Sequence, residues 1–403
     1  MGFIKELKIE GINYTGNKYV CDKCFGDYAL QEYIRENAVS DTCDYCGRSS
    51  DDNEIAAQLH EVVGFILQGI RYEWDEPVNC VGWCSQEGGW VGVSVIDTHD
   101  LFADELELDI QHDSLFSDII DSIDIYEWCQ GDPYSLPPGE EMFYDWKEFA
   151  DQIKHRIRYV FFRVLRRDRR DVFDKRQPHV ILNKLGELVN ELGLINSLLA
   201  GTEFIRARIS EKKLRPTVKE LGPPPLHKAI YSNRMSPAGI PMFYGSIDEK
   251  TAIAETYDKK DKKKRYVTVA AFRTMKDFKI LDLTQLPDFP SLFDERKRHL
   301  RAPLIFLRSF LADFSKPIKK DGQEHIEYVP TQVVTEYFRH IFRDGSRDVV
   351  RGILYPSARR KTGKSCVLFF EDKDCFQANI ANEDEDKKWL CMYSSSVKVI
   401  KLK

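Results

Sequence analysis

Four cysteines near the N-terminus have the residue type and the spacing of a metal site. They occur as CDKC and, after eighteen intervening residues, as CDYCG. Each C-x2-C pair can turn two thiolates toward one ion, and Gly47 permits the tight second turn. Four thiolates fill the tetrahedral shell of zinc and leave no position for a catalytic water. We therefore predict a structural zinc ribbon, with coincidentally spaced free thiols as the alternative; the ligands would be Cys21, Cys24, Cys43 and Cys46.

The other cysteines do not repeat this pattern. Cys80 and Cys84 form a C-x3-C pair without a second pair, which is more typical of packing than of metal binding. The four isolated cysteines are predicted to be buried apolar residues. They are Cys129, Cys366, Cys375 and Cys391.

A second stretch with residue types suited to chemistry is SNRMSPAGIPMFYGSIDEKTAIAET at 232–256. It sets one Arg, one Tyr and one Glu among turn residues and a short apolar run. It could be a surface hairpin that leads into a helix, or the wall of a pocket that handles a charged substrate. The elements predicted around this stretch bear on which of these two interpretations is correct.

Composition limits the class of protein. A chain of 403 residues that is 42% hydrophobic can bury more than one core, and two or three domains are expected. The start, MGFIKELKIEG, lacks the apolar stretch of a secretory signal, and no run approaches the roughly 20 apolar residues that cross a bilayer. We therefore expect a cytoplasmic protein with reduced thiols and no membrane partner. The net charge of −6 gives no global argument for nucleic acid as a partner.

Charged residues are distributed unevenly along the chain. No Lys or Arg occurs between Tyr72 and Trp146, whereas the segment 147–176 is strongly basic. The two segments are predicted to face each other or the solvent within one helical domain. A basic helix that binds RNA or an acidic partner is the alternative.

The hydrophobic pattern changes from helical to mixed along the chain. Helices are predicted over 53–70, 146–164 and 180–199, and a rigid loop at LGPPPLHKA, 221–229. Strands are predicted beyond it, at IPMFYGS, RYVTVAAF, FKILDLT, VVRGILYPS, CVLFF and VKVIKL. Two helices interrupt them, at 249–257 and at TQVVTEYFRHIF, where Thr331 is the expected N-cap.

These elements predict an α+β protein with three domains. They are a four-cysteine zinc ribbon at 1–50, a mainly helical domain at 51–200 and a mixed α/β domain at 201–403. Several common catalytic patterns do not occur in the sequence. TGKS at 362–365 lacks the first glycine of a phosphate-binding loop because Ala358 stands there, and no G-x-G-x-x-G, H-E-x-x-H or G-x-S-x-G is found.

Motifs in the C-terminal half resemble the RES domain across about residues 200–375. They occur in the order of that family, as GTEFIRARIS, LGPPP, NRMSPAGIPMFYGSIDEKTAIAET, ILDLT, EYVPTQ and RGILYPSARR. The N-terminal 200 residues resemble the helical, cysteine-bearing HEPN/RES region found ahead of some RES domains. That likeness lies in CDKCFGDYALQEYI, CDYCG and WKEFADQIKHRIRYVF.

The resemblance implies a fold similar to the ADP-ribosyltransferase toxins and an activity that destroys NAD+. Carried over, the arginine of the family falls on Arg206, with Arg208 as its competitor two residues later; on a strand both would point to one face. The family tyrosine, glutamate and serine fall on Tyr244, Glu255 and Ser357, and a further family arginine falls on Arg234.

The residue types suit this chemistry. Cleavage of the nicotinamide–ribose bond develops positive charge on the sugar, which the carboxylate of Glu255 would stabilise. Arginine forks suit the two charges of the pyrophosphate. Tyr244 can stack on the nicotinamide, and Ser357 can hydrogen-bond its ribose or amide. The alternatives are a solvated helix residue for Glu255, a core residue for Tyr244 and a turn cap for Ser357.

The leading prediction is an NAD+ glycohydrolase or phosphorylase that serves as a toxin or defence effector and carries structural Zn2+. ADP-ribosyl transfer to a macromolecule is one alternative, and a zinc-ribbon module that binds nucleic acid and has an inactive RES fold is another. The HEPN ribonuclease pattern, Arg followed after four to six residues by His, does not occur. A regulatory or sensing role is therefore expected for the N-terminal half. An antitoxin, a regulatory protein and a second copy of the chain are open as partners.

Overall fold

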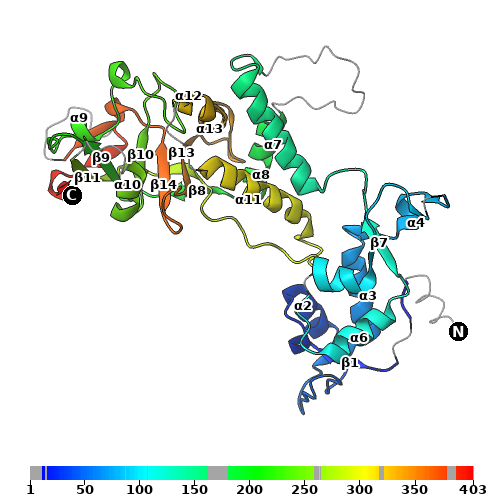
Figure 1. The fold of residues 1–403 in the computed structure, drawn as a ribbon. Helices are drawn as coiled ribbons and strands as arrows, with labels where there is room; N and C mark the ends of the chain where they lie inside the picture. The colour runs from blue at the N-terminus through cyan, green and yellow to red at the C-terminus, as the bar shows by residue number, and fades with distance from the viewer. Residues whose placement is uncertain are drawn as a thin grey trace. The chain divides into compact units, whose positions relative to one another are not determined.

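The chain forms two compact units, described here from a computed structural model (Figure 1). The first unit contains Met1–Glu141 and Asp288–Ile305, and the second contains Met142–Pro287 and Phe306–Lys403. The structure describes residues 11–13, 16–86, 88–106, 108–161, 180–257, 263, 265–316, 322–378 and 387–402. Within these ranges, no helix combines the length and apolar character needed to cross a membrane.

The first unit begins with short elements that carry the four cysteines. β1 (Tyr19–Cys21) pairs antiparallel with β2 (Ala56–Gln58), and the helical turn η1 (Asp22–Cys24) follows β1 directly. α2 (Tyr28–Glu36) begins after Asp27, whose carboxylate accepts two backbone N–H bonds from the first turn. This N-cap explains why the helix starts there.

The core of the first unit forms around α3 (Leu59–Ile70), whose apolar face is fully buried. α6 (Asp113–Ser122) packs against α3. The returning segment 288–305 contributes Phe293, which lies so close to Gly69 that a Cβ at this glycine would stand 2.4 Å from the ring. The helix predicted from residue 53 begins later, because the backbone at Ala56 pairs with β1 and with Ser40 instead.

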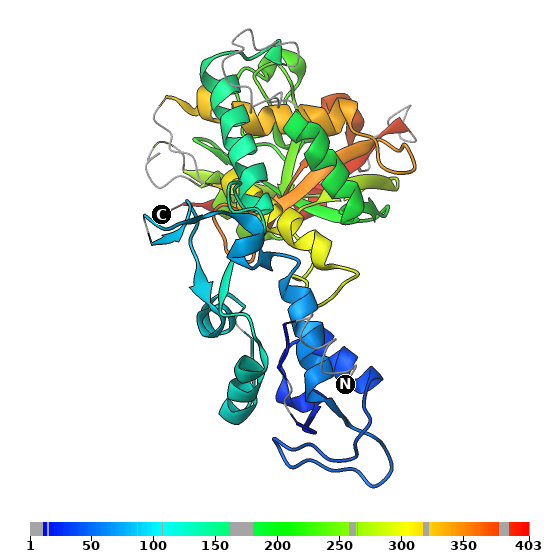
Figure 2. The ribbon, with the colours of Figure 1, turned by 90° about the vertical axis from the view of Figure 1, so that its right-hand side faces the viewer.

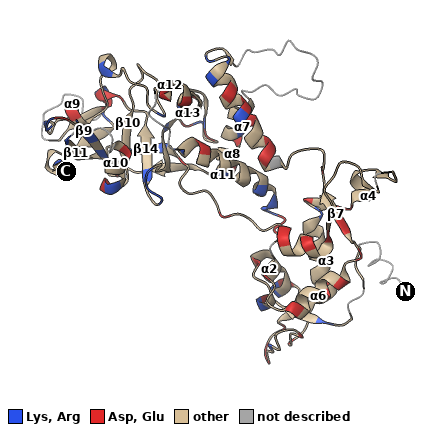
Figure 3. Cartoon of the chain, in the orientation of Figure 1, with Lys and Arg blue, Asp and Glu red and all other residues tan. Residues whose placement is uncertain are grey.

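Short elements complete the first unit. β7 pairs with β3 and β6, and β4 pairs with β5. In Figure 3, α6 carries the red of Asp and Glu residues, as expected from the long stretch without Lys or Arg. The bounds are β3 (Trp74–Asp75), α4 (Pro77–Cys80), β4 (Trp83–Cys84), β5 (Gly89–Trp90), β6 (Ile96–Asp97), α5 (Thr98–Asp100), η2 (Leu101–Glu105) and β7 (Glu127–Gln130).

A ten-stranded mixed sheet dominates the second unit; Figure 2 shows it from the side. The strand order is β15-β16-β11-β9-β10-β14-β13-β12-β8, and β17 also pairs with β11. The pairs β12–β13 and β15–β16 are parallel and the others antiparallel. The bounds are β8 (Ile195–Leu198), β9 (Glu203–Ser210), β10 (Phe243–Ser246), β11 (Tyr266–Thr274), β12 (Phe278–Asp282), β13 (Val350–Pro356), β14 (Lys364–Leu368), β15 (Cys375–Gln377), β16 (Leu390–Met392) and β17 (Lys398–Lys401).

The predicted strands are confirmed. Each of the six runs singled out in the sequence overlaps a strand of this sheet. Two of these strands, β13 and β14, are neighbours inside the sheet and are buried on both faces. A strand that is covered on both sides reads as a nearly continuous apolar run, which is why these runs were recognisable. The chain is thus an α+β protein with a large mixed sheet in its C-terminal part.

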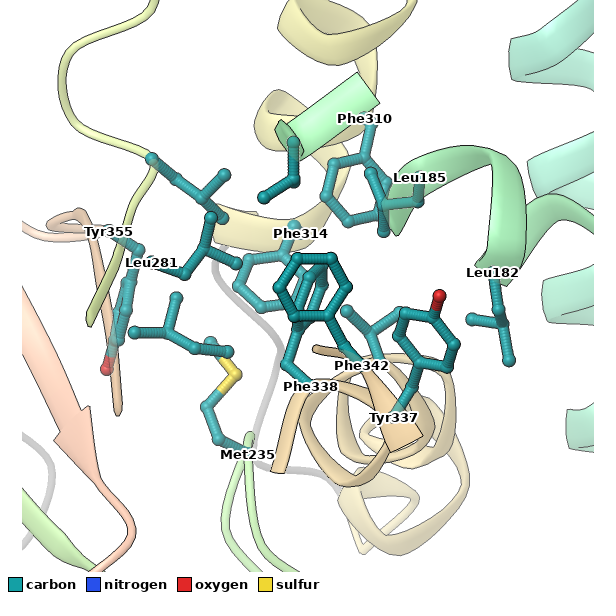
Figure 4. Close-up of a cluster of buried hydrophobic side chains, with 14 of the residues drawn as sticks. Leu182, Leu185, Met235, Leu281, Phe310, Phe314, Tyr337, Phe338, Phe342 and Tyr355 are labelled. Carbon is teal, nitrogen blue, oxygen red and sulfur yellow. The ribbon is translucent and has the colours of Figure 1, made fainter. Parts of the chain in front are cut away.

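Helices pack on this sheet and build the largest apolar core. Figure 4 shows how Leu185 of α8, Phe310 and Phe314 of α11, Phe338 of η6 and Tyr355 of β13 meet there. The bounds of the later helical elements are α7 (Pro138–His155), α8 (Val180–Glu191), α9 (Val218–Leu221), η4 (Leu226–Lys228), α10 (Glu249–Thr256), η5 (Arg298–Leu300), α11 (Arg301–Ser315), α12 (Glu324–Glu327), α13 (Val329–Glu336), η6 (Tyr337–Ile341), η7 (Asp372–Asp374) and η9 (Ser394–Ser396).

Two further details of the predicted helices are wrong. The helix predicted over 180–199 ends at Glu191, because Gly193 has a positive φ of 62° and the next residues pair with β12 as a strand. Thr331 is not an N-cap, since α13 already begins at Val329. Its hydroxyl donates instead to the carbonyls of Tyr328 and Arg234, which ties α13 to the turn at 233–236.

The described part of the basic segment is held by ion pairs within the second unit. Lys147 of α7 donates to Asp313 of α11 at 2.9 Å, and Lys154 donates to Glu327 of α12 at 2.7 Å. The helix predicted over 146–164 runs from Pro138 to His155, and residues 162–176 of the basic segment lie outside the described residues.

Candidate active site

A cavity of about 620 Å³ opens in the second unit beside β9 and β10. Its walls come from β9, from the loop at 224–242, from β10, from α10 and from the loop after β13. Five residues that the sequence singled out line this one cavity. They are Arg206, Arg208, Arg234, Tyr244 and Glu255. The stretch at 232–256 is therefore the wall of a cavity as well as a turn and a helix.

Arg206 is the most deeply buried cation of the site. β9 holds its side chain against the ring of Phe243, and Nη1 donates to the carbonyl of Tyr244 at 3.0 Å. Its Nε has no hydrogen-bond partner among the described residues. Burial, and after it the positive charge of Arg208, lowers the pKa of Arg206 to about 9. The guanidinium still carries its charge at neutral pH, so the cavity favours an anionic ligand.

Arg208 is less buried than Arg206 and lines the same cavity, as the two-residue spacing on a strand predicts. Its Nη2 donates to the carbonyl of Gly222 at 2.9 Å, which fixes the start of the proline loop. Burial also lowers the pKa of Arg208, and the nearby carboxylate of Glu220 opposes this effect. β9 thus presents two adjacent cations to one cavity.

The turn at 233–236 supplies Arg234, and α13 and α11 hold it in place. Gln332 of α13 donates to the carbonyl of Asn233 at 2.7 Å, and Thr331 bonds the carbonyl of Arg234. Nη1 of Arg234 donates to the carbonyl of Phe314, near the end of α11, at 2.8 Å. The position of this arginine therefore depends on two helices that are distant in sequence.

Tyr244 lies on β10 and contacts both Arg206 and the turn at 233–236. Its hydroxyl shares a hydrogen bond of 2.9 Å with Ser236, and burial raises its pKa well above the ordinary value for a tyrosine. The hydroxyl is therefore protonated and held in place, and the cavity is lined by the half-buried side chain.

Glu255 lies in the last turn of α10. The helix starts after Asp248, whose carboxylate accepts from the backbone N–H of Thr251 at 2.9 Å. Glu255 itself is exposed and lines the cavity. Its Oε1 accepts a hydrogen bond of 2.5 Å from the hydroxyl of Ser357.

Ser357 is both the partner of Glu255 and a turn residue. Its hydroxyl oxygen accepts the backbone N–H groups of Arg359 and Arg360 at 3.1 Å each. One hydroxyl thus caps the turn and also bonds Glu255. Ser357 does not line the cavity itself and contacts it through Glu255.

The cavity is also lined by residues that the sequence did not single out, among them Tyr328 and Arg359. Tyr328, from the motif EYVPTQ, is half buried, and burial raises its pKa. Arg359, from the motif RGILYPSARR, is exposed at the cavity. The motifs contained both, but only the folded loops show which of their residues lie at the cavity.

This arrangement can bind an anion and stabilise a cation at separate places. The arginines attract phosphate or carboxylate groups through paired N–H donors. An ionised carboxylate with a fixed hydroxyl donor can stabilise positive charge that develops next to it. A ligand with anionic groups and a bond that breaks with positive charge fits both features.

The four cysteines of the first unit form a separate cluster. The Sγ atom of Cys21 lies 3.8 Å from that of Cys24 and 3.5 Å from that of Cys46, and the Sγ atom of Cys24 lies 3.6 Å from that of Cys43. Zinc–sulfur bonds of about 2.3 Å at tetrahedral angles place sulfurs roughly 3.8 Å apart. The donor set and its spacing therefore fit one zinc ion.

The surroundings of the cysteine cluster suit a negatively charged metal–thiolate group. Gly47 has a positive φ of 69° and donates its N–H to the carbonyl of Cys43, as the second turn requires. The buried carboxylate of Asp22 holds Arg48 at 2.9 Å and Arg35 at 3.2 Å beside the cluster. The isolated cysteines are buried, as predicted: Cys129, Cys366, Cys375 and Cys391.

Two family models match the chain. HEPN/RES N-terminal domain 1 matches residues 36–166, and the RES domain matches residues 208–390. This confirms the resemblance of both halves. The RES match begins at Arg208, so that Arg206 lies two residues before it. No curated protein and no solved structure shows significant similarity to the chain.

Proposed function

We propose that this protein, which belongs to the RES-domain family and carries a HEPN/RES N-terminal domain, cleaves the nicotinamide–ribose bond of NAD+. The RES family acts on NAD+ in general. One observation carries the proposal: Arg206, Arg208, Arg234 and the Ser357-bonded Glu255 surround a single cavity. NAD+ has two features that complement this cavity, an anionic pyrophosphate and a glycosidic bond that breaks with positive charge on the sugar.

The arginines bind the pyrophosphate in this proposal. Arg206 has no carboxylate partner among the described residues, so a bound phosphate oxygen would supply the counter-charge that the fold does not. Arg208 and Arg234 each donate one N–H to a backbone carbonyl, and this bond orients the remaining N–H groups of the guanidinium. A fixed fork loses little entropy on binding.

Glu255 acts on the ribose. Its carboxylate lies beside C1′ and the 2′-hydroxyl and stabilises the oxocarbenium-like transition state. Tyr244 lies against the nicotinamide ring with its own hydroxyl engaged by Ser236. The nicotinamide leaves, and water or inorganic phosphate attacks C1′.

The cysteine cluster binds structural zinc in this proposal. The four thiolates of Cys21, Cys24, Cys43 and Cys46 complete the shell, so the metal stabilises the fold of the first unit and takes no part in catalysis. The HEPN/RES N-terminal domain then serves as a regulatory or sensing module. The whole chain acts as a toxin or defence effector that depletes NAD+.

The test is nicotinamide release from NAD+ by the full chain, with and without inorganic phosphate. Wild type should release nicotinamide, and Glu255→Gln should lower the rate at least about 100-fold, the loss expected for one transition-state group. Glu249→Gln is the matched control, because Glu249 lies on the same helix and pairs with Lys398 away from the cavity. No release by wild type under either condition would refute the proposal.

The products distinguish the acceptors. Free ADP-ribose indicates water, and its 1″-phosphate indicates phosphorolysis. Label that appears on a protein or nucleic acid indicates ADP-ribosyl transfer to a macromolecule. Binding of RNA or DNA that survives Glu255→Gln, without any turnover, would favour the nucleic-acid-binding alternative instead.

A further inference from the structure

The loop 357–363, between β13 and β14, is fastened to α10 at two places. Near the end of α10, the hydroxyl of Ser357 donates to Glu255. At the start of α10, Nη1 of Arg360 lies 2.8 Å from the carboxylate of Asp248 and 3.3 Å from the hydroxyl of Thr251. The first contact involves the proposed catalytic carboxylate, and the second lies at the opposite end of the same helix.

Hydrogen bonds within the loop connect the two contacts. The backbone N–H of Ser357 donates to the carbonyl of Gly363 at 2.8 Å, and that of Gly363 donates to the carbonyl of Arg360 at 3.0 Å. The N–H of Arg360 in turn donates to the hydroxyl oxygen of Ser357 at 3.1 Å. A movement of Arg360 therefore displaces the hydroxyl that holds Glu255.

Hydrogen bonds from the loop backbone also set the direction of the hydroxyl proton of Ser357. A serine oxygen has two lone pairs and one proton. The N–H groups of Arg359 and Arg360 take up the acceptor capacity, so that the proton is left for the carboxylate of Glu255. Ser357 is thereby a dedicated donor to Glu255, and the geometry of the turn makes it one.

Close packing leaves little freedom between the loop and the helix. A Cβ built on Gly363 would lie 2.6 Å from Oγ1 and 2.8 Å from Cγ2 of Thr251. The loop backbone therefore rests directly on the first turn of α10, where Asp248 also caps the helix. An ion pair at this point acts on a short, tightly packed connection.

We propose that Arg360 is a positioning residue: its ion pair with Asp248 holds the turn at 357–363 so that Ser357 keeps the carboxylate of Glu255 oriented into the cavity. This inference rests on the proposed function and adds a residue to its site. The adjacent Arg359 points into the cavity, whereas Arg360 anchors the loop. The two neighbouring arginines thus have separate roles.

The test measures kcat and KM for NAD+ with the full chain. Arg360→Ala should lower kcat about tenfold, the size of one lost charge-assisted hydrogen bond, and leave KM within about twofold. Arg360→Lys retains the charge and should recover most of the loss. Lys361→Ala is the matched control, since Lys361 is the next residue, is exposed and forms no ion pair among the described residues; its kcat should equal that of wild type.

A double-mutant cycle tests whether Arg360 acts through Ser357. In the Ser357→Ala background, Arg360→Ala should lower kcat less than about twofold further, because the donor that it positions is already gone. Independent, multiplying effects of the two substitutions would overturn the proposal, and so would a change in KM alone. If Arg360→Ala does not fold, Asp248→Asn replaces it, because asparagine still caps α10 but removes the charge.

Amide hydrogen exchange separates this inference from the proposed function. In Arg360→Ala without NAD+, the amides of residues 357–363 should exchange at least about tenfold faster than in wild type, while those of β9 remain protected. Unchanged exchange would refute the positioning role even in an active enzyme. Faster exchange in a protein that never releases nicotinamide would refute the proposed function and retain the anchor.

Discussion

The guanidinium of Arg206 donates to the backbone carbonyl of Tyr244 at 3.0 Å, although no carboxylate pairs with it among the described residues. A cation that is only 9% exposed and has no counter-charge is costly for the fold. In the proposed function, the bound pyrophosphate supplies the missing charge. Arg206 would then combine a cost in stability with a role in binding.

The substitution Arg206→Met should separate these two effects. The KM for NAD+ should rise at least about tenfold, because the pyrophosphate loses a charged donor. The free energy of unfolding should change by no more than about 2 kcal/mol, since removal of the buried charge offsets the hydrogen bond lost by Tyr244. The measurements are steady-state kinetics and chemical denaturation. Arg273→Met is the control, because Arg273 pairs with Glu203 outside the cavity; a large loss of stability with unchanged KM would contradict the argument.

Ser357→Ala removes the donor to Glu255 and should lower kcat for NAD+ about tenfold to 100-fold, the range for a hydrogen bond to a charged group. The turn loses an acceptor at the same time, so a modest loss of thermal stability is expected. Nicotinamide release measures the first effect and thermal unfolding the second. Ser346→Ala, in the exposed turn around Asp344, should leave kcat unchanged. Full activity of Ser357→Ala would exclude the Ser357–Glu255 bond from the mechanism.

Gly363→Ala should push the loop 357–363 away from α10. The new Cβ would lie 2.6 Å from Oγ1 of Thr251, closer than the Cβ atoms of folded proteins approach other heavy atoms. We expect a loss of about 1–3 kcal/mol in the free energy of unfolding together with a lower kcat. The double variant with Thr251→Ala should recover part of kcat by making room. Gly345→Ala has open space around it and is the control; equal effects at both glycines would refute the packing argument.

The Asp313 carboxylate should make the second unit sensitive to acid. Partial burial raises the pKa of Asp313, but hydrogen bonds from Lys147 and Trp146 outweigh it, so the pKa lies below its ordinary value. A depressed pKa in the folded state contributes stability above the ordinary carboxyl pKa, and this contribution is lost as the pH falls through the folded value. Asp313→Asn should cost about 1–2 kcal/mol at pH 7 and less near pH 2. Denaturation at both pH values measures this, and a cost that does not change with pH would contradict it.

Removal of metal should unfold the first unit before the second. One zinc per chain is expected by elemental analysis, and Cys43→Ser should abolish it, because each thiolate fills one of four positions. Cys84→Ser should leave zinc binding intact, since Cys84 does not belong to the cluster. Limited proteolysis of the chelated protein should cut the segment around residues 19–58 first. Full protection of this segment after zinc removal would show that the cysteines stabilise the unit without a metal.

Local patterns in the sequence predicted the elements of the second unit well. Alternating and continuous apolar runs identified its strands, because the burial of a strand is recorded in adjacent residues. The cluster of four cysteines could also be predicted, since the spacing within each C-x2-C turn sets the direction of the sulfur atoms. Two of the boundary errors, at residues 53–58 and 192–199, fall where strand pairing with a distant partner replaced a helical pattern.

The order of the motifs in the sequence determined by itself which residues to consider at the site: Arg206, Arg208, Arg234, Tyr244, Glu255 and Ser357. Only the tertiary structure decided which of them touch. Glu255 and Ser357 are separated by 102 residues, and they meet because β10, β14 and β13 are neighbours in the sheet, so that the helix after β10 lies against the loop after β13. Local propensity extends over a few residues, whereas the order of strands in a sheet is settled by the burial of the whole unit.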